Sequence, residues 1–597
     1  MKNNKIFFLL LIFILLQSNT LSTIRYVKAG NPTPVAPYTS WATAADSIWK
    51  ALRISVNGDT VFLGNGIYTE TDTLPYGVSL IGSGIDSCIW DLSKSSIDPF
   101  RAALIMDNYS VVEGIHFKGT SITRGYGLRA WYADKSLIKN CKFSNCYWGA
   151  SVQATDFTNN VFENMNIGII SLSRISGGAS YIADNRFINC YTSINIDPAP
   201  YKNYIRNNYF YADNVSNPTF IEHISGGQPE INNNAFILAR ANNSSQKFID
   251  AHNGDLIQNN VFITLTNKST PFILTEDPII SKNNHFEGLM DAHHLYFQAI
   301  GPQLVIRNNN YWNTRLLYYP SYNNPYRDTE LQQDPMFIDS MDFHLQKYSP
   351  LIDRGDSSVL DKDGSISDIG VYGGPLGESY VYIDKAPRTP VGLAVTLKAD
   401  TVLLKWRKNT ESDIRKYYIY TDSTTNVSTD TNRYLTSVND TLIKIAKSYF
   451  SSNSAYFRIL AVDSGYNKSQ GGIAVGVVLT GTGEGGELAG EKYKLYQNYP
   501  NPYGGAGKEK TKISYELKKR GYVKLRVYNV VGEELAVLVN GEQEAGYYEE
   551  EFGAPEVRKG LENHILTSGI YIYKLEIRDS ETGHPVFNES RKMLYVK

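Results

Sequence analysis

The 597-residue sequence predicts an all-β protein in which a parallel β-helix is followed by two β-sandwich domains. Three observations lead to this prediction. A short motif with paired asparagines and a closing aromatic residue recurs about every 24 residues through the first half of the chain. The last copy of the motif ends at residue 311, and from residue 386 short alternating strands separated by turns follow. A Gly-rich stretch at 480–492 then precedes a second region of that kind.

The N-terminus has the features of a targeting segment. In "MKNNKIFFLLLIFILLQSNT" two lysines precede an unbroken apolar run at residues 6–16. This run is shorter than the roughly 20 residues that cross a hydrocarbon core, so we interpret residues 1–22 as a secretory signal peptide. No later apolar run is long enough for a transmembrane segment. The net charge of −2, without a long basic run, gives no sign of a nucleic-acid partner, and we expect a secreted monomer.

The repeated motif lies within residues 25–380, which we predict to form the β-helix. Its clearest copies are "FTNNVF" (157–162), "IRNNYF" (205–210), "INNNAF" (231–236), "IQNNVF" (257–262) and "IRNNNY" (306–311). Helical repeats would show apolar residues at 3.6-residue spacing, whereas these segments show short alternating runs broken by Asn, Gly and Asp. Three short strands in about 24 residues predict one coil of a parallel β-helix.

Stacked coils lie about 4.8 Å apart, so equivalent residues form columns. We expect the second asparagine of each pair to point inward and to form hydrogen bonds along the stack, which satisfies its buried amide. The predicted column is Asn160, Asn185, Asn208, Asn234, Asn260, Asn284 and Asn309, with Cys141 at the same position of an earlier coil. Cys146 and Cys190 fall two coils apart, too far for a disulfide, so all four cysteines are predicted to be free and buried.

An amphipathic helix is predicted at residues 40–52, before the first coils. It would place Trp41, Ala44, Ala45, Ile48 and Leu52 on one face, behind Ser40 as N-cap, and would cover the open end of the coil. The glycine-punctuated stretches 58–70 and 77–84 follow. This opening resembles secreted right-handed β-helix proteins of the pectate-lyase-like superfamily over residues 25–380. The resemblance implies a right-handed coil but no single chemistry, because that fold hosts lyases, hydrolases, epimerases and non-catalytic adhesins.

The segments 333–355 and 361–374 resemble the closing part of such proteins. Within the second, Asp361, Asp363 and Asp368 form the pattern D-x-D-G-x-x-x-D, whose oxygen ligands could hold Ca²⁺, the one cofactor that the sequence suggests. The alternative is an Asx-rich loop without an ion.

Two further modules are expected after the coil. Residues 386–479, with "TVLLKW" (401–406) and "AYFRILAVDSGYNKS" (455–469), resemble a fibronectin type III domain, which implies a core formed by Trp406, Tyr418 and Ile459.

Residues 493–597 contain "YQNYPNP", "GYVKLRVYNVVGEELAVLV" and "LTSGIYIYKLE", and end on "RKMLYVK". They resemble the C-terminal sorting domain of type IX secretion cargo. This resemblance implies that the type IX machinery is a partner, and that the tail directs export across the outer membrane before removal. The alternative is an ordinary sandwich, which requires only that Val523, Leu525 and Val527 point inward.

Candidate catalytic residues lie on three successive coils. Aligning Phe220, Phe248 and Phe272 places Glu222 beside Asp250, about 5 Å away in the next coil, as in a retaining glycosidase. His223 adjoins Glu222, His252 would lie over Glu276, and Asp197 would extend the column. The alternative is that these are solvated outer-face residues. Candidates for stacking on sugar rings are Trp131, Tyr132, Trp148, Tyr201, Tyr204 and Trp312.

The function that the sequence favours is a secreted or cell-surface β-helix protein that binds an extended polysaccharide or a surface partner along the coil. The alternative is a polysaccharide lyase or glycoside hydrolase acting on an extracellular glycan. The motifs of the characterised β-helix lyases and polygalacturonases are not recognisable in the sequence, which favours binding or an activity of another kind.

Overall fold

The computed structural model is all-β. It describes residues 22–595 except for 95–101, 121–124, 172–178, 197–201, 225, 242–245, 253, 266–271, 276, 289–294, 298–303, 315–325, 340, 473, 481–492, 499–500, 504–509, 530–533, 544–545, 554–568 and 581. The predicted signal peptide and Gly-rich linker therefore lie almost wholly outside the described residues. The chain divides into one unit of residues 1–335 with 351–381 and a second of 336–350 with 382–597, and each unit is described by itself.

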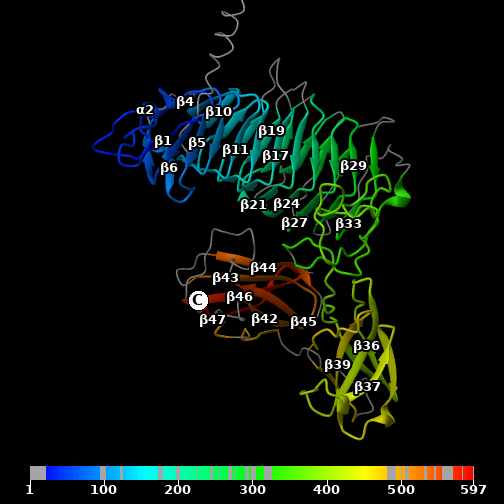
Figure 1. The fold of residues 1–597 in the computed structure, drawn as a ribbon. Helices are drawn as coiled ribbons and strands as arrows, with labels where there is room; N and C mark the ends of the chain where they lie inside the picture. Colours follow the sequence, from blue (N-terminus) through cyan, green and yellow to red (C-terminus); the bar gives the residue numbers. More distant parts are fainter. Residues whose placement is uncertain are drawn as a thin grey trace, which may run out of the picture. The chain divides into compact units, whose positions relative to one another are not determined.

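The first unit is a right-handed parallel β-helix built from three long sheets (Figure 1). The twelve-stranded sheet contains β1 (Ile24–Val27), β2 (Thr60–Leu63), β5 (Ser79–Gly82), β8 (Val111–Glu113), β11 (Ser136–Lys139), β14 (Thr155–Thr158), β17 (Ser180–Ala183), β20 (Asn203–Arg206), β23 (Glu230–Asn232), β26 (Leu256–Gln258), β29 (Ile280–Lys282) and β32 (Val305–Arg307). The eleven-stranded sheet contains β3 (Gly66–Tyr68), β6 (Cys88–Asp91), β9 (His116–Lys118), β12 (Lys142–Ser144), β15 (Val161–Glu163), β18 (Arg186–Ile188), β21 (Tyr209–Val215), β24 (Ala235–Ala241), β27 (Val261–Thr264), β30 (His285–Glu287) and β33 (Asn310–Trp312). The ten-stranded sheet contains β4 (Asp72–Leu74), β7 (Ala102–Asp107), β10 (Tyr126–Tyr132), β13 (Trp148–Val152), β16 (Ile167–Ser171), β19 (Thr192–Ile196), β22 (Thr219–His223), β25 (Lys247–Ala251), β28 (Ile273–Thr275) and β31 (Leu295–Phe297).

The asparagine column is confirmed. From Asn160 to Asn309, the Nδ2 of each asparagine donates to the Oδ1 of its counterpart in the next coil at 3.0–3.1 Å. The same Oδ1 also accepts the backbone N–H of the previous column member, and the backbone N–H of Cys141 donates to Asn160 Oδ1. Every amide in the column is therefore paired although the side chains are buried.

The first asparagine of each pair has a separate role. It adopts the left-handed backbone conformation, with φ of 52–57° from Asn207 to Asn308, which asparagine tolerates better than most residues. In four of the later coils its side chain also binds the backbone of the segment 351–381. Asn233 Nδ2 donates to the Val371 carbonyl at 2.8 Å, and Asn283 Oδ1 accepts from the Asp356 N–H at 2.7 Å. One asparagine therefore makes the turn while its neighbour satisfies the interior.

The closing aromatic residues form a second column inside the coil. Successive rings from Phe117 to Tyr311 stack with centroids 4.6–5.3 Å apart and planes within 11°. Near its start, Trp90 stacks on Phe117 at 5.6 Å. The cysteines are free and buried, as expected, and burial raises the pKa of Cys146 and of Cys190 to about 12.

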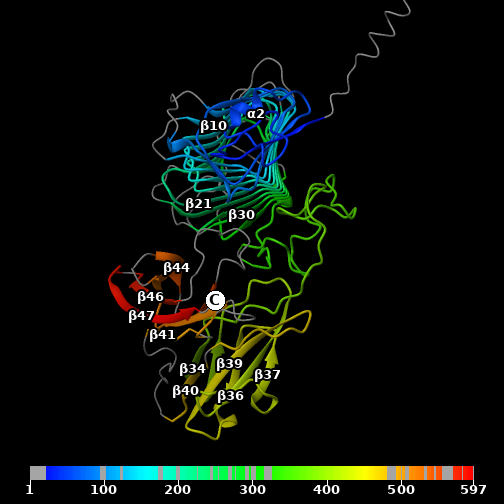
Figure 2. The same cartoon turned by 60° about the vertical axis from the view of Figure 1, so that its left-hand side comes forward.

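The helix at the start of the coil is shorter than expected. Only α2 (Ile48–Leu52) is helical, and Figure 2 shows it at the blue end of the coil. Ser40 is not its N-cap, and Trp41 is 45% exposed, outside the helix, where its ring packs on Tyr26 at 4.7 Å. The N-cap side chain forms no capping bond. The carboxylate of Glu70 caps the helix instead, accepting the N–H groups of Ile48 and Trp49. A 3₁₀ turn follows β6 at Leu92–Lys94, and another lies at Arg327–Thr329.

The middle sandwich lies in the second unit and has two antiparallel sheets. One contains β34 (Ala394–Lys398), β35 (Thr401–Lys405) and β38 (Leu442–Ala446); the other contains β37 (Tyr434–Val438), β36 (Ile414–Asp422), β39 (Ser454–Asp463) and β40 (Val475–Val478). Short 3₁₀ turns lie at Thr431–Arg433 and Lys447–Tyr449. Trp406 and Ile459 are buried as expected, but the prediction for Tyr418 is wrong. Tyr417 fills the core against Trp406 at 5.3 Å, because β36 presents the opposite alternation.

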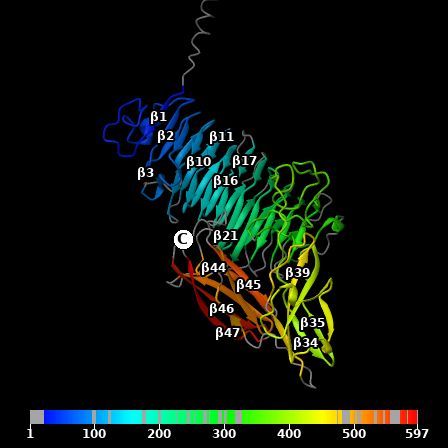
Figure 3. The same cartoon turned by 60° about the horizontal axis from the view of Figure 1, so that its bottom comes forward.

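The C-terminal sandwich, orange to red in Figure 3, also pairs a three-stranded and a four-stranded antiparallel sheet. The first contains β41 (Lys494–Leu495), β42 (Lys510–Leu517) and β45 (Gly546–Gly553); the second contains β44 (Glu534–Gln543), β43 (Gly521–Tyr528), β46 (Gly569–Asp579) and β47 (Pro585–Tyr595). Val523, Leu525 and Val527 are fully buried, as the alternation predicts. Among the described residues, no helix has the length and apolar character needed to span a membrane.

Candidate functional site

The ten-stranded sheet brings Glu222 and Asp250 together as expected. Strands β22 and β25 pair in parallel with Glu222 opposite Asp250, and Asn195 of β19 lies opposite Glu222 on the other side. Directly opposed residues in neighbouring strands are about 4.8 Å apart. The buried neighbours Ile221 and Ile249 pack into the coil, so Glu222 and Asp250 face away from the core.

Each of these carboxylates has a polar partner in the same sheet. Asn195 Nδ2 donates to Glu222 Oε2 at 2.9 Å, and Lys247 Nζ forms an ion pair with Asp250 Oδ2. All four side chains are half-buried. We call Asn195, Glu222, Asp250 and Lys247 the polar row. It offers an amide, two carboxylates and an ammonium group on one sheet face.

The two predicted histidines differ from the carboxylates in their surroundings. His223 is buried, with Nδ1 2.9 Å from Asp255 Oδ2 and Nε2 2.5 Å from the Gly226 carbonyl. Burial raises the pKa of Asp255, and the bonds to His223 oppose that shift. Because its side chain is buried, His223 lies on the inner side of the strand that carries Glu222.

His252 lies in the turn after β25, where its Nδ1 is 3.0 Å from Asp277 Oδ2. Its ring meets that of His223 edge to face at 5.4 Å. Glu276, which was expected beneath His252, and Asp197 lie outside the described residues.

An aromatic pair shares this sheet with the polar row. Tyr126 of β10 and Trp148 of β13 stack at 4.6 Å with planes 21° apart. A Cβ on the next residues, Gly127 and Gly149, would meet core phenylalanines, so the two preceding rings face away from the core. Strand pairing continues this row of residues from Trp148 through β16, β19 and β22 to Lys247.

A second aromatic pair lies on the twelve-stranded sheet. Tyr181 and Tyr204 stack at 4.7 Å, and the Arg206 guanidinium lies over both rings, at 5.5 and 4.5 Å. The sequence prediction included Tyr204 and Trp148 but missed Tyr181 and Tyr126. The signal for Tyr181 was present, because it precedes the isoleucine of its motif copy just as Tyr204 does. Of the other candidates, Trp312 is half-buried, the side chains of Trp131 and Tyr132 are not described, and Tyr201 lies outside the described residues.

The predicted calcium loop uses its carboxylates as hydrogen-bond acceptors for the backbone. Asp361 accepts the N–H groups of Asp368 and Gly374, and Asp363 accepts from the backbone and hydroxyl of Ser365. Asp368 in turn accepts the N–H of Asp353. Within the described part of the chain these three aspartates are not gathered as a ligand group. Calcium binding by this loop stays a prediction.

Comparisons with known proteins give likeness of fold alone. No family model matches the chain, and no curated protein matches it. Among solved structures, pectate lyase Pel9A is 15% identical, with a TM-score of 0.37 over 59% of this chain and 97% of that one. An alginate lyase from Paenibacillus sp. str. FPU-7 is 12% identical, with a TM-score of 0.30 over 47% and 95%. XylC in complex with xylose is 10% identical, with a TM-score of 0.36 over 66% and 91%.

Proposed function

We propose that the β-helix binds an extended polysaccharide along the outer face of its ten-stranded sheet. The observation that supports this proposal is that the Tyr126–Trp148 stack and the polar row occupy the same face of one sheet. Aromatic rings stack on the apolar faces of sugars, and amide, carboxylate and ammonium groups form hydrogen bonds with sugar hydroxyls. Because the groups repeat coil by coil, successive sugars of an extended chain would each meet a contact.

The alternative proposal is cleavage by the Glu222–Asp250 pair, as a lyase or glycoside hydrolase. Their separation suits a retaining mechanism, which needs one protonated and one ionised carboxyl group. Asp250 forms an ion pair with Lys247, and one carboxylate oxygen of Glu222 accepts a hydrogen bond from Asn195. Catalysis would require these two contacts to be broken so that the carboxyl groups could reach the scissile bond, whereas sugar binding can use the side chains as they are. Binding is therefore the function that we favour.

A binding screen with three variants tests this proposal. We expect the full chain to bind at least one acidic or neutral polysaccharide. Trp148→Ala should weaken that binding about tenfold, because loss of one aromatic contact on the order of 1 kcal/mol, together with the apolar area of the ring, approaches the roughly 1.4 kcal/mol of a tenfold change. Glu222→Gln should also weaken binding. Tyr181→Ala, which removes a matched ring from the twelve-stranded sheet, should leave it unchanged.

Two results of this screen would count against binding on the ten-stranded sheet. One is equal loss of affinity in Trp148→Ala and Tyr181→Ala, and the other is no binding to any polysaccharide of the panel. New reducing or unsaturated ends that appear with the wild type, and disappear with Glu222→Gln, would instead favour the enzymatic alternative.

We further propose that residues 493–597 direct export through the type IX machinery, which would place the protein at the cell surface or outside the cell. The support is the set of motifs "YQNYPNP", "SGIYIYKL" and the basic-apolar C-terminus. In a host with that secretion system, a chain ending at residue 492 should stay in the periplasm while the full chain reaches the surface or medium. Equal export of both chains, measured by fractionation, would contradict the proposal.

A further inference from the structure

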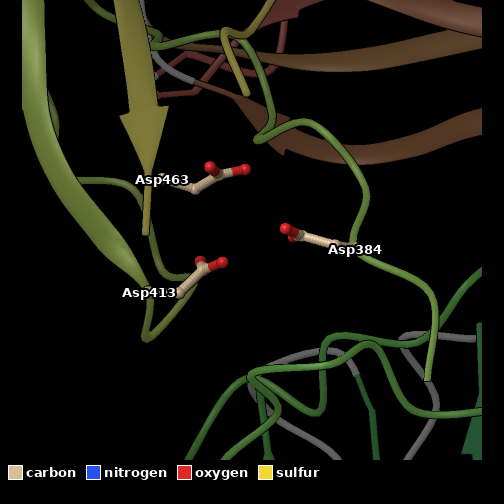
Figure 4. Close-up of side chains that lie close together, drawn as sticks. All are labelled: Asp384, Asp413 and Asp463. Carbon is tan, nitrogen blue, oxygen red and sulfur yellow. The ribbon is translucent and has the colours of Figure 1, made fainter. Parts of the chain in front are cut away.

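Three aspartates from separate segments of the second unit gather at one place in the middle sandwich. Asp384 lies in the segment that leads into the sandwich, Asp413 directly precedes β36, and Asp463 ends β39. One carboxylate oxygen of each lies within 4.8 Å of the others. Figure 4 shows the three carboxylates pointing toward one another. No lysine, arginine or histidine in the described part of the chain forms an ion pair with any of them.

Within the described part of the chain, the carboxylate of Asp413 has no partner from another residue. The residue is only 8% exposed, and Ser464 Oγ donates to its backbone carbonyl at 3.0 Å, but no other described residue donates a hydrogen bond to its carboxylate. Asp463, Asp384 and Glu411 place further negative charge near this carboxylate. Buried carboxylates are normally paired, so an unpaired one that points at two others indicates a missing positive charge.

The other two carboxylates are held in position by their surroundings. Both oxygens of Asp463 accept hydrogen bonds from Asn467, from its backbone N–H at 2.7 Å and from its Nδ2 at 3.1 Å. A Cβ at Gly465 would lie 1.9 Å from Asp384 Oδ2, so a larger residue there would displace that carboxylate from its present position. The loop after β39 therefore both orients Asp463 and accommodates Asp384.

We propose that Asp384, Asp413 and Asp463 bind a divalent cation of the calcium type. Three carboxylates from three segments supply the hard oxygen ligands that such an ion prefers, and backbone carbonyls or water complete its shell. The ion neutralises the mutual repulsion of the three charges. It also links the segment at Asp384 to the start of β36 and the end of β39, and so holds the segment that leads into the middle sandwich against its strands.

Titration of the full chain with Ca²⁺ alone tests the proposal, after treatment with chelator and removal of the chelator. We expect calorimetry to show a site that Asp413→Asn weakens at least tenfold, with affinity in the range of about 10⁻⁴–10⁻³ M typical of extracellular modules. Asp384→Asn should have the same effect. Asp430→Asn, an exposed aspartate of the same sandwich outside the cluster, is the matched control and should leave the isotherm unchanged.

Asp361→Asn separates this site from the loop at residues 361–368. An isotherm that survives Asp361→Asn and is lost in Asp413→Asn assigns the ion to the middle sandwich. An isotherm that is unchanged in Asp413→Asn, or no binding of Ca²⁺ by the wild type up to roughly 10 mM, overturns the proposal.

Thermal unfolding gives a second readout with opposite signs. Without Ca²⁺, Asp413→Asn should melt no lower than the wild type, because it removes one of three repelling charges. With Ca²⁺, the wild-type transition of this sandwich should rise while that of the variant stays in place. If Asp413→Asn fails to fold, Asp384→Asn carries the same comparison, since Asp384 is half-exposed in an extended segment. A rise of equal size in wild type and variant contradicts the site.

Discussion

Replacing Asn208 by alanine is expected to destabilise the β-helix by about 3–5 kcal/mol, because it leaves several buried polar groups without partners at roughly 1–3 kcal/mol each. Asn208 Nδ2 donates to the Ile182 carbonyl at 2.7 Å and to Asn234 Oδ1 at 3.0 Å. Its Oδ1 accepts the backbone N–H and the side-chain Nδ2 of Asn185, at 2.9 and 3.1 Å. Water cannot easily replace these bonds in a closed column.

The measurement is the midpoint and slope of denaturant unfolding, followed by intrinsic fluorescence. Its matched control is Asn207→Gly, because Asn207 is exposed and has φ of 52°, which glycine adopts freely. That control should change stability by less than about 1 kcal/mol. If the two variants unfold at the same denaturant concentration, the asparagine column does not stabilise the coil as argued.

The columns of the β-helix could be predicted from sequence because a single register determines them. Once the closing aromatic was aligned from coil to coil, the partners of Asn160 and the pairing of Glu222 with Asp250 followed from the constant rise between coils. The same alignment predicted free thiols, since it placed Cys146 and Cys190 two coils apart. Stacked repeats make sequence-distant contacts predictable in this way.

Features that depend on local alternation were harder to predict. In β22 both Phe220 and Ile221 point inward, so His223 is buried while Glu222 is not. A sequence window cannot show such a departure from strict alternation, because both residues are apolar. In β36 the sequence alone cannot show whether Tyr417 or Tyr418 faces the core, because the two adjacent side chains are identical. In the structure it is Tyr417 that packs against Trp406.

Features that depend on tertiary partners could not be predicted at all. The cap of α2 comes from Glu70, more than 20 residues further along the chain, so the Ser40 signal was misleading. The cluster of Asp384, Asp413 and Asp463 joins three segments that share no spacing rule. The D-x-D-G-x-x-x-D pattern was visible in the sequence, yet its aspartates accept hydrogen bonds from their own loop.

Phe187→Ala is expected to destabilise the β-helix by about 3–5 kcal/mol, the cost typical of truncating a buried phenylalanine without collapse of the site. Phe187 is fully buried and stacks on Phe162 and Phe210, each at 4.9 Å, so both neighbours lose a ring contact. The rigid rise between coils prevents the column from closing the gap, which keeps the cavity large.

Two matched variants serve as controls. Phe187→Leu should lower the free energy of unfolding less, by about 1–2 kcal/mol. Tyr191→Ala removes a ring that is 46% exposed in the same coil, and should lower it by under about 1 kcal/mol. Denaturant midpoints in that order would support a dry, close-packed aromatic column. A Phe187→Ala midpoint equal to that of Tyr191→Ala would mean that neighbouring coils relax into the space, and that the column adds little to the stability of the coil.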